Sequence, residues 1–325
     1  MTKDAKQNQQ QSARSAWHWQ PPTAIQLSPI MDMPPRPVAL LKWIASYWLV
    51  IGATSLLFVI AWAVFSVLQP ELTVMRTLAW GWILAIWTRN LILLTVIAGA
   101  LHFWFYIYKG QGNALKYDPR DLARDNGKFW FRDQVKDNMF WSLTSGVTIW
   151  TGFEVAYFWA AANGLAPGLE WRQNPVWFAL CFLLIPIWSS FHFYLIHRAL
   201  HWQPLYKLAH GLHHRNINVG PWSGIAMHPI EHLMYFSSIT IHFLIPTHPT
   251  HVLFHLFVQG INPAFSHSGF DGVMIDEKKR METGDFFHQL HHRHINCNYG
   301  TVEMPWDKVF GTFHDGTTAK TRSKP

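Results

Sequence analysis

Long apolar runs constrain this chain more than any other feature of its sequence. Trp43 to Leu68 is 26 residues without a formal charge, beyond the length of about 20 that spans a bilayer as a helix. Shorter apolar runs cover Asn90–Tyr108 and Met139–Ala162, the second of which contains Glu154, and Pro175–Phe191 begins a fourth run that continues helically into the histidines. We therefore predict four membrane-spanning helices, with Arg89 near the end of the second span, where its side chain can snorkel to the interface.

The composition agrees with a membrane protein. Half of the 325 residues are hydrophobic and only 14% are charged, against about 25% in soluble domains. The formal net charge of +7 comes from basic residues in short loops rather than on one stripe, so we expect no nucleic-acid partner. With two cysteines, the chain has no disulfide framework.

The charges of the loops predict an orientation. Five Lys or Arg residues precede the first predicted span and seven lie between Lys109 and Lys136, whereas the loop before the fourth span has only Arg172. Cytoplasmic loops of membrane proteins carry the excess of basic residues. We expect the N-terminus to be cytoplasmic and the fourth helix to deliver His192 and the residues after it to the same side.

The predicted fold class is all-α: a multi-pass bundle of about four spans with a cytosolic helical cap. We divide the chain into a flexible tail (1–37), a transmembrane region (38–188), a metal-binding domain (189–316) and a C-terminal tail (317–325). The runs Leu233–Pro246 and Val252–Ala264 are short for spans. They are interpreted as a re-entrant or interfacial hairpin, with a tight pair of tilted spans as the alternative.

The histidines are unevenly distributed along the chain: six of the 20 lie within the 23 residues that end at His214. Helical spacing i, i+3, i+4 puts three residues on one face. That spacing occurs twice, and each trio is expected to aim three imidazoles at one place: His210, His213 and His214, and His288, His291 and His292. His197 and His201 share a face by i, i+4 spacing, whereas His192 lies about 140° from His197 around an ideal helix.

This many imidazoles indicate a metal site. Imidazole suits iron, zinc, copper or nickel, and more than four or five of them exceed the needs of one ion. The absence of a cysteine pair at ligand spacing argues against a structural zinc knuckle. We therefore expect two metal ions. Glu231, Asp285 and Asn298 are candidates to hold the second N–H of ligand imidazoles, or to serve as caps or turn residues.

Several ordered motifs resemble one known family. Residues 189–315 resemble the fatty acid hydroxylase and sterol desaturase superfamily of membrane-bound di-iron oxygenases. The matching motifs are His192-x4-His197-x3-His201, His210-x2-His213-His214, PWSG at 221–224, His228-Pro-x-Glu231, His267-Ser-Gly, His288-x2-His291-His292, Asn298-Tyr299-Gly300 and the segment that begins at Trp306.

The resemblance implies a set of metal ligands. These are His192, His197, His210, His213, His214, His267, His288, His291 and His292, with His201 and His228 left open as ligands or outer-shell residues. His192 enters on the resemblance, against its helical geometry. Some relatives have one more histidine four residues before the position of His267, where this chain has Pro263. The tenth ligand is therefore open.

The resemblance also implies an activity. Two iron ions, replaceable by zinc in purified protein, would use O2 to hydroxylate or desaturate a C–H bond of a membrane lipid. We find no flavin, nicotinamide or iron–sulfur motif, so electrons would come from a separate donor, either a cytochrome b5-like carrier or a ferredoxin with its reductase. A metal transporter or di-haem cytochrome is the alternative. Both place polar ligands within the spans, whereas these histidines gather beyond the fourth.

Overall fold

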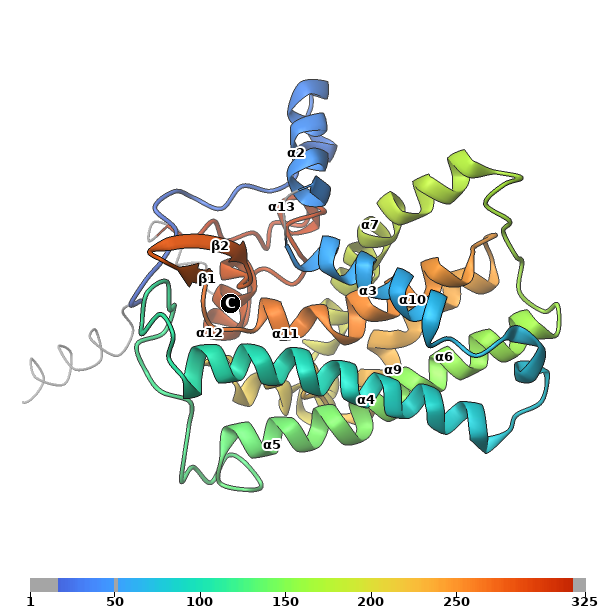
Figure 1. Cartoon of the computed structure of the whole chain (residues 1–325). Helices are drawn as coiled ribbons and strands as arrows, with labels where there is room; N and C mark the ends of the chain where they lie inside the picture. The colour runs from blue at the N-terminus through green and yellow to red at the C-terminus, as the bar shows by residue number, and fades with distance from the viewer. Residues whose placement is uncertain (1–16, 50–51, 318–325) are drawn as a thin grey trace, which may run out of the picture.

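The computed structural model describes residues 17–49 and 52–317. Its long helices lie side by side as a bundle (Figure 1). The members are α3 (Ala53–Val67), α4 (Trp80–His102), α6 (Val147–Ala162), α7 (Pro175–Leu200) and α10 (Pro249–Gly260). The C-terminal elements and the loops beside them cover one end of this bundle (Figure 1).

Two helices of the described residues are long and apolar enough to cross a bilayer. One is α4 with its π-helical extension, Trp80–Ile107. The other is α7, which continues helically from the fourth predicted span into the histidines, through Pro186 in its interior. The prediction of four spans is thus supported for two helices, and the second span begins ten residues earlier than the charge pattern indicated.

The first predicted span is not one helix. The structure divides Trp43–Leu68 between α2 (Pro37–Leu49) and α3, which have 13 and 15 residues. Gly52 has extended backbone angles and precedes the first turn of α3. Helix α2 projects away from the bundle (Figure 1). The prediction of a continuous 26-residue span is therefore wrong, because a run without charge does not reveal a break in backbone conformation.

A polar cluster joins α4 to α6 within the bundle. Arg89 is 8% exposed and pairs with the fully buried carboxylate of Glu154. Asn90 Nδ2 donates to the other oxygen of Glu154 at 3.0 Å, and Arg89 Nη1 donates to Gln69 Oε1 at 2.7 Å. Arg89 was predicted to snorkel to the interface. Instead, its guanidinium group is paired inside the protein. Removing one partner of such a buried pair typically costs about 3–5 kcal/mol.

The third predicted span lies within a continuous helical stretch. This stretch consists of α5 (Gln134–Trp141), a π-helical turn (Ser142–Gly146) and α6. Asp133 caps its start by accepting from the backbone N–H of Lys136 at 3.0 Å. The stretch lies beside α4, where Trp87 Nε1 donates to Thr148 Oγ1 at 3.2 Å.

The predicted re-entrant or interfacial hairpin packs within the bundle. It consists of α9 (Pro229–Phe236), a 3₁₀ helix (Ser237–Phe243), α10 and α11 (Asn262–Ser266). Ten of the twelve residues of α10 are buried, and the helix packs against α3, α6 and α7. The segment therefore lies among the long helices, and its buried positions include polar side chains such as His251, His255 and Gln259.

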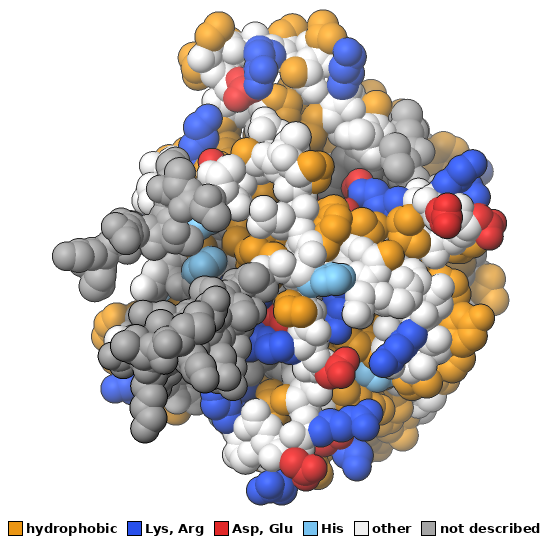
Figure 2. Space-filling view, turned by 90° about the vertical axis from the view of Figure 1, so that its left-hand side faces the viewer, with side chains coloured by type: hydrophobic (Ala, Val, Ile, Leu, Met, Phe, Trp, Pro, Cys, Tyr) orange, Lys and Arg blue, Asp and Glu red, His pale blue; other side chains and the backbone are white. Residues whose placement is uncertain are grey.

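The C-terminal part contains the helix with the last histidine cluster and two short strands. Strands β1 (Gly272–Ile275) and β2 (Lys278–Glu282) form an antiparallel hairpin that pairs Gly272 with Glu282. The all-α prediction missed this hairpin, because its two strands are only four and five residues long. Helices α12 (Phe286–His294) and α13 (Trp306–Val309) follow. The face at this end carries many Lys and Arg side chains (Figure 2).

Part of the predicted N-terminal tail packs on this domain. Trp17 lies edge-on to Phe286 of α12 with ring centroids 5.0 Å apart. The Cζ atom of Arg293 lies over the ring of Trp17, 3.2 Å from its centroid. The backbone N–H groups of Ile25 and Ser28 donate to Asp315 O and Val302 O. The described residues 17–36 are therefore a strap across α12 and the C-terminal segment, while residues 1–16 lie outside the described part.

Candidate metal centre

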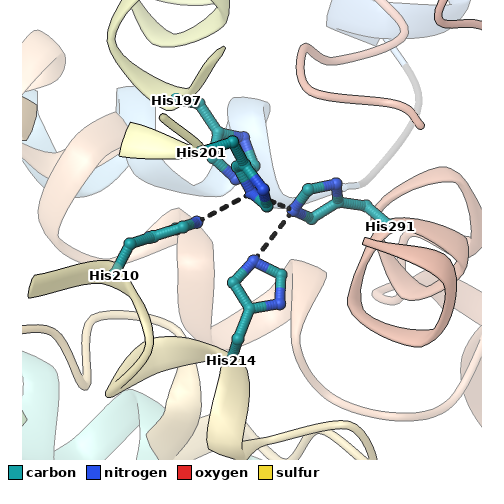
Figure 3. A group of neighbouring side chains, drawn as sticks. All are labelled: His197, His201, His210, His214 and His291. Atoms are coloured by element: carbon teal, nitrogen blue, oxygen red, sulfur yellow. Dashed lines mark hydrogen bonds between the residues drawn. The ribbon is translucent and has the colours of Figure 1, made fainter. Parts of the chain in front are cut away.

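Nine histidines gather in two groups at the end of the bundle. The ligand atoms of each group lie within 4.8 Å of one another. The first group, drawn in Figure 3, consists of His197, His201, His210, His214 and His291. The second group consists of His213, His267, His288 and His292.

Four segments of the chain supply the nine histidines: the end of α7, the turns from His210 to His214, the end of α11 at His267, and α12. His197 lies in the last turns of α7, and His201 is the residue that caps its C-terminus. Consecutive residues then separate: His213 joins the second group and His214 the first. Helix α12 divides in the same way, because His291 belongs to the first group whereas His288 and His292 belong to the second. The prediction that each trio aims at one place is wrong, since each trio supplies both groups.

The Nε2 atoms face one another at nearly constant spacing. In the first group, His201 Nε2 lies 3.0 Å from His210 Nε2 and 3.2 Å from His291 Nε2, and His291 Nε2 lies 3.0 Å from His214 Nε2 (Figure 3). In the second group the three Nε2 atoms are 3.1–3.2 Å apart: His267, His288 and His292.

This spacing matches the edges of a metal coordination polyhedron. An ion that binds imidazole nitrogens at about 2.1 Å separates neighbouring nitrogens by about 3.0 Å at right angles and about 3.4 Å in a tetrahedron. The observed 3.0–3.2 Å lies in that interval. Each group therefore has the size of a shell of ligands around one ion.

Backbone carbonyls fix the tautomer of three imidazoles. The Nδ1–H groups of His197 and His291 donate to Tyr299 O at 2.6 Å and to Cys297 O at 2.7 Å. His267 Nδ1–H donates to Pro263 O at 3.0 Å. A carbonyl oxygen only accepts, so the proton is on Nδ1 and the Nε2 lone pair faces the group. A histidine binds a metal ion through such a nitrogen lone pair.

Glu231 fixes a fourth imidazole. Its Oε1 lies 2.7 Å from His210 Nδ1, and both side chains are buried. Burial raises the pKa of Glu231 to about 7, because the ionised carboxylate is desolvated. This is the outer-shell arrangement that keeps ligand histidines oriented in metalloproteins. Of the three predicted outer-shell residues, Glu231 is the one that contacts an imidazole of the two groups.

Burial also keeps the histidines neutral. It lowers the pKa of His201 to about 2, of His210 to about 3 and of His213 to about 4. At pH 7 these imidazoles carry no charge, which is the protonation state required of a metal ligand. Neutral rings with convergent lone pairs fit a bound cation, and the donor set of imidazoles alone fits iron or zinc.

Two predicted ligands lie outside both groups. His192 Nε2 lies 3.0 Å from Ser237 Oγ. The rotation of about 140° between His192 and His197 explains this placement. His228 precedes α9 as its N-cap, and its Nδ1 accepts from the backbone N–H of Ile230 at 3.2 Å. His201, left open from the sequence, lies inside the first group.

The other two predicted outer-shell residues brace the backbone of α12. Asp285 caps the helix by accepting from the N–H groups of Phe287 and His288 at 3.0 and 3.3 Å. Asn298 has a positive φ of 55° and donates to the carbonyls of Phe287 and His314 at 3.1 and 3.0 Å. Both positions orient α12 through its main chain rather than through a ligand imidazole.

The carbonyls that fix the imidazoles were not predicted, because a main-chain acceptor leaves no mark in a residue pattern. One indirect signal exists in the PWSG motif. A Cβ atom on Gly224 would lie 2.4 Å from the carbonyl carbon of Pro263. Only glycine allows this loop to approach Pro263, whose oxygen accepts from His267.

A cavity connects the two groups to the interior of the bundle. Its wall includes imidazoles of both groups, His197 and His210 from the first and His213, His267 and His288 from the second. Most of the rest of the wall comes from α7, α9, α10 and α11. It includes apolar side chains, among them Pro186, Phe193 and Val258, and polar ones, among them Gln259, Asn262 and Glu303. An apolar molecule in this cavity would therefore contact both histidine groups.

Comparison with known proteins gives the same region of the chain. Residues 182–312 match the fatty acid hydroxylase family. The chain is 30% identical over 149 residues to a Delta(7)-sterol 5(6)-desaturase of Eremothecium gossypii, covering 46% of this chain and 42% of the relative. It is 27% identical over 239 residues to a Delta(7)-sterol-C5(6)-desaturase of Nicotiana tabacum, covering 70% of this chain and 83% of the relative.

A third relative carries a different name. The chain is 28% identical over 149 residues to methylsterol monooxygenase 1 of Gallus gallus, covering 44% of this chain and 50% of that protein. The chain thus spans half or less of the length of two of these relatives. No solved structure matches the chain. The matched residues contain all nine grouped histidines, and this part of the chain is similar to fatty acid hydroxylases and to sterol desaturases.

Proposed function

We propose that the protein is a membrane-bound non-haem di-iron oxygenase that hydroxylates or desaturates a lipid. One observation carries this proposal: two groups of histidines, with convergent Nε2 lone pairs, line a cavity whose wall also includes apolar side chains. The first group would hold one ion and the second group the other. When bound, the two irons supply the activation of O2 that breaks an unactivated C–H bond.

The chain's own residues supply orientation and the exclusion of water. Glu231 and the carbonyls of Tyr299, Cys297 and Pro263 hold four rings with Nε2 facing inward. Phe193 and Val258 are among the apolar side chains of the cavity wall. They would place an apolar substrate beside both ions and keep bulk water away from the reacting carbon.

The substrate follows from the surroundings of the cavity. Helices α7 and α10 contribute to its wall, and α7 is one of the two helices able to cross a bilayer. A lipid could therefore enter sideways from the membrane. The names of the relatives make sterols the first lipids to test, with acyl chains and aminolipid head groups as the other classes.

The proposed topology is multi-pass, with the N-terminus and the histidine groups on the cytoplasmic side. It is supported by the seven basic residues between Lys109 and Lys136 and by the position of His197 and His201 at the C-terminal end of α7. The reducing electrons would come from a separate cytoplasmic carrier, for which the sequence of this chain contains no substitute.

The proposal is tested by comparing the lipids of cells with and without the protein. We expect lipids heavier by one oxygen atom, or lighter by two hydrogen atoms, only in cells that make it. With ¹⁸O2, a hydroxylated product should carry the label. His213→Ala should abolish the product and leave membrane insertion intact. A purified protein with a haem absorption band, or an unchanged product with His213→Ala, would contradict the proposal.

A further inference from the structure

The histidine groups approach the protein surface at one residue. Eight of the nine grouped histidines are buried, with exposed fractions of at most 6%. His201 is the exception and is only part-buried. Its Nε2 nevertheless lies 3.0 Å from His210 Nε2 and 3.2 Å from His291 Nε2. The ring of His201 is thus in contact both with the interior of the first group and with the outside.

The residues around His201 form an exposed basic and aromatic surface. We define the His201 surface as Arg198, Trp202 and Lys207, which flank His201 in the chain and are all exposed. Trp202 is 65% exposed. Lys207 follows Tyr206, whose ring centroid lies 5.6 Å from that of His201. Exposed Trp and Arg side chains are enriched where proteins bind other proteins.

The His201 surface is basic, and one buried carboxylate, that of Asp307, interacts electrostatically with its Arg198. The chain has no Asp or Glu between Glu170 and Glu231. Arg198 lies over the ring of Phe310, which follows α13, at 5.4 Å. Helix α13 adds the exposed Lys308, whereas its one carboxylate, Asp307, is buried and accepts from the N–H groups of Tyr299 and Gly300.

We propose that the His201 surface is where a small one-electron carrier with an acidic face docks and passes electrons to the first histidine group. This inference rests on the proposed function. Conversion of a C–H bond to an alcohol uses one O2, two electrons and two protons and releases one water. The carrier is oxidised twice per turnover while O2 is reduced. Electron transfer slows steeply with distance, so the carrier must dock where a ligand is nearest the surface.

The carrier is favoured over a membrane surface by the position of the patch. His201 follows the last residue of α7, ten residues beyond the apolar run that ends at Phe191. A patch that only held lipid head groups would have no reason to surround the one accessible ring of the site. Charge complementarity acts mainly on the association rate, by about 10- to 1000-fold at low salt.

The test uses the full-length, iron-loaded protein and two electron sources. The first source is the soluble haem domain of a cytochrome b5, an acidic one-electron carrier, with its reductase and NADH. The second is dithionite, which reduces the protein for a single turnover without docking. For the double variant Arg198→Gln, Lys207→Glu we expect at least about a tenfold slower carrier-supported reaction at low salt. The single-turnover product after dithionite should be unchanged.

A matched control and a binding measurement complete the test. Arg280→Glu reverses an exposed charge on β2 and should leave both reactions within about twofold of the unmodified protein. Carrier binding, measured on metal-free protein, should weaken for the double variant, and addition of salt should remove the difference.

Three results would overturn the inference. They are a carrier-supported rate of the double variant within twofold of the original, an equal loss of the dithionite-driven product, or weakened binding to anionic vesicles with unchanged carrier binding. If the original protein forms no oxidised lipid from either electron source, the proposed function itself fails, whatever the variants do.

Discussion

The protein contains two buried, histidine-rich regions, and they differ in what their nitrogen atoms face. One is the pair of groups at the end of α7. The other, here the α10 region, contains His242, His248, His251 and His255. His242, His251 and His255 are fully buried there. These four residues lie in or beside the runs that were predicted to form a re-entrant or interfacial hairpin.

In the α10 region each buried ring uses both nitrogens within the protein. His242 Nε2 lies 2.9 Å from His255 Nδ1, and His255 Nε2 lies 2.9 Å from Ser238 Oγ. His242 Nδ1 contacts Thr247 Oγ1 at 3.1 Å. His251 Nε2 donates to Phe178 O at 2.9 Å, and its Nδ1 accepts from the N–H of His248 at 3.0 Å.

The difference shows that burial and density of histidine do not make a metal site. In the α10 region the rings form a chain of hydrogen bonds that joins α10 to the 3₁₀ helix before it and to α7. In the metal centre, four rings have Nδ1 fixed by a carbonyl or by Glu231, and their Nε2 atoms face the histidine groups. Convergence of lone pairs, rather than the number of rings, indicates a place for an ion.

The strongest test of this contrast exchanges one histidine in each region. His291→Ala should abolish iron binding by the first group and reduce lipid oxidation at least about 100-fold, because outer-shell partners alone are worth about 10- to 100-fold. His255→Leu should retain the iron of the folded protein while lowering its melting temperature. Iron per chain, measured by mass spectrometry on both purified variants, checks this. Equal loss of iron from the two would remove the distinction.

The outer shell of the metal centre offers the next test. Glu231→Gln keeps a hydrogen-bond acceptor for His210 but removes its charge, so we expect metal affinity to fall about 10- to 100-fold. Asp285→Asn is the matched control, since this buried carboxylate caps α12 and asparagine caps as well. Competition with a chelator measures both affinities. If Glu231→Gln lowers the metal affinity no more than Asp285→Asn does, Glu231 does not support metal binding through His210.

Acid should destabilise the protein through the buried histidines of both regions. Burial lowers the pKa of His210 and His242 to about 3, below the ordinary 6.5. Stability from such neutral rings is complete above pH 6.5 and is lost as pH falls toward 3, by about 1.4 kcal/mol per pH unit for each ring. We expect the melting temperature of metal-free protein to fall below pH 6.5. Bound metal should raise the melting temperature at each pH above about 3, because only the folded state brings the ligands together, and no increase at any of these pH values would argue against ligation.

The smallest expected effects belong to the two histidines outside the groups. His192→Ala should lose its hydrogen bond to Ser237, worth about 1 kcal/mol. His228→Ala should lose the cap of α9, also worth about 1 kcal/mol. Both variants should bind as much iron as the original protein. Loss of iron with His192→Ala would restore the ligand assignment that the family resemblance implied.

The sequence predicted the histidines of the site better than their grouping. Spacing of i, i+4 paired His197 with His201, as the structure does, whereas the motif match favoured His192. Neither spacing nor motif indicated that His213 and His214 face different groups, because that depends on how the π-helical and 3₁₀ turns around them end. The carbonyl partners are main-chain atoms and are invisible to residue patterns.

Predictions about the bundle held where a single helix decided them. The fourth run continues as a helix into the histidines, as predicted. Glu154, in the third run, pairs with Arg89 of a neighbouring helix. The length of the first charge-free run predicted one continuous helix, but the extended backbone of Gly52 interrupts it. The burial of α10 depends on its neighbours α3, α6 and α7. The residue pattern of a single segment cannot reveal such packing.

The central claim is that nine histidines form two separate ion sites, one with five imidazoles and the other with four. It is tested most directly by counting iron in the full-length protein purified from iron-sufficient medium, together with its absorption spectrum. The account predicts two iron ions per chain and no haem band. One iron or none after reconstitution with ferrous iron, or a haem band, would contradict it.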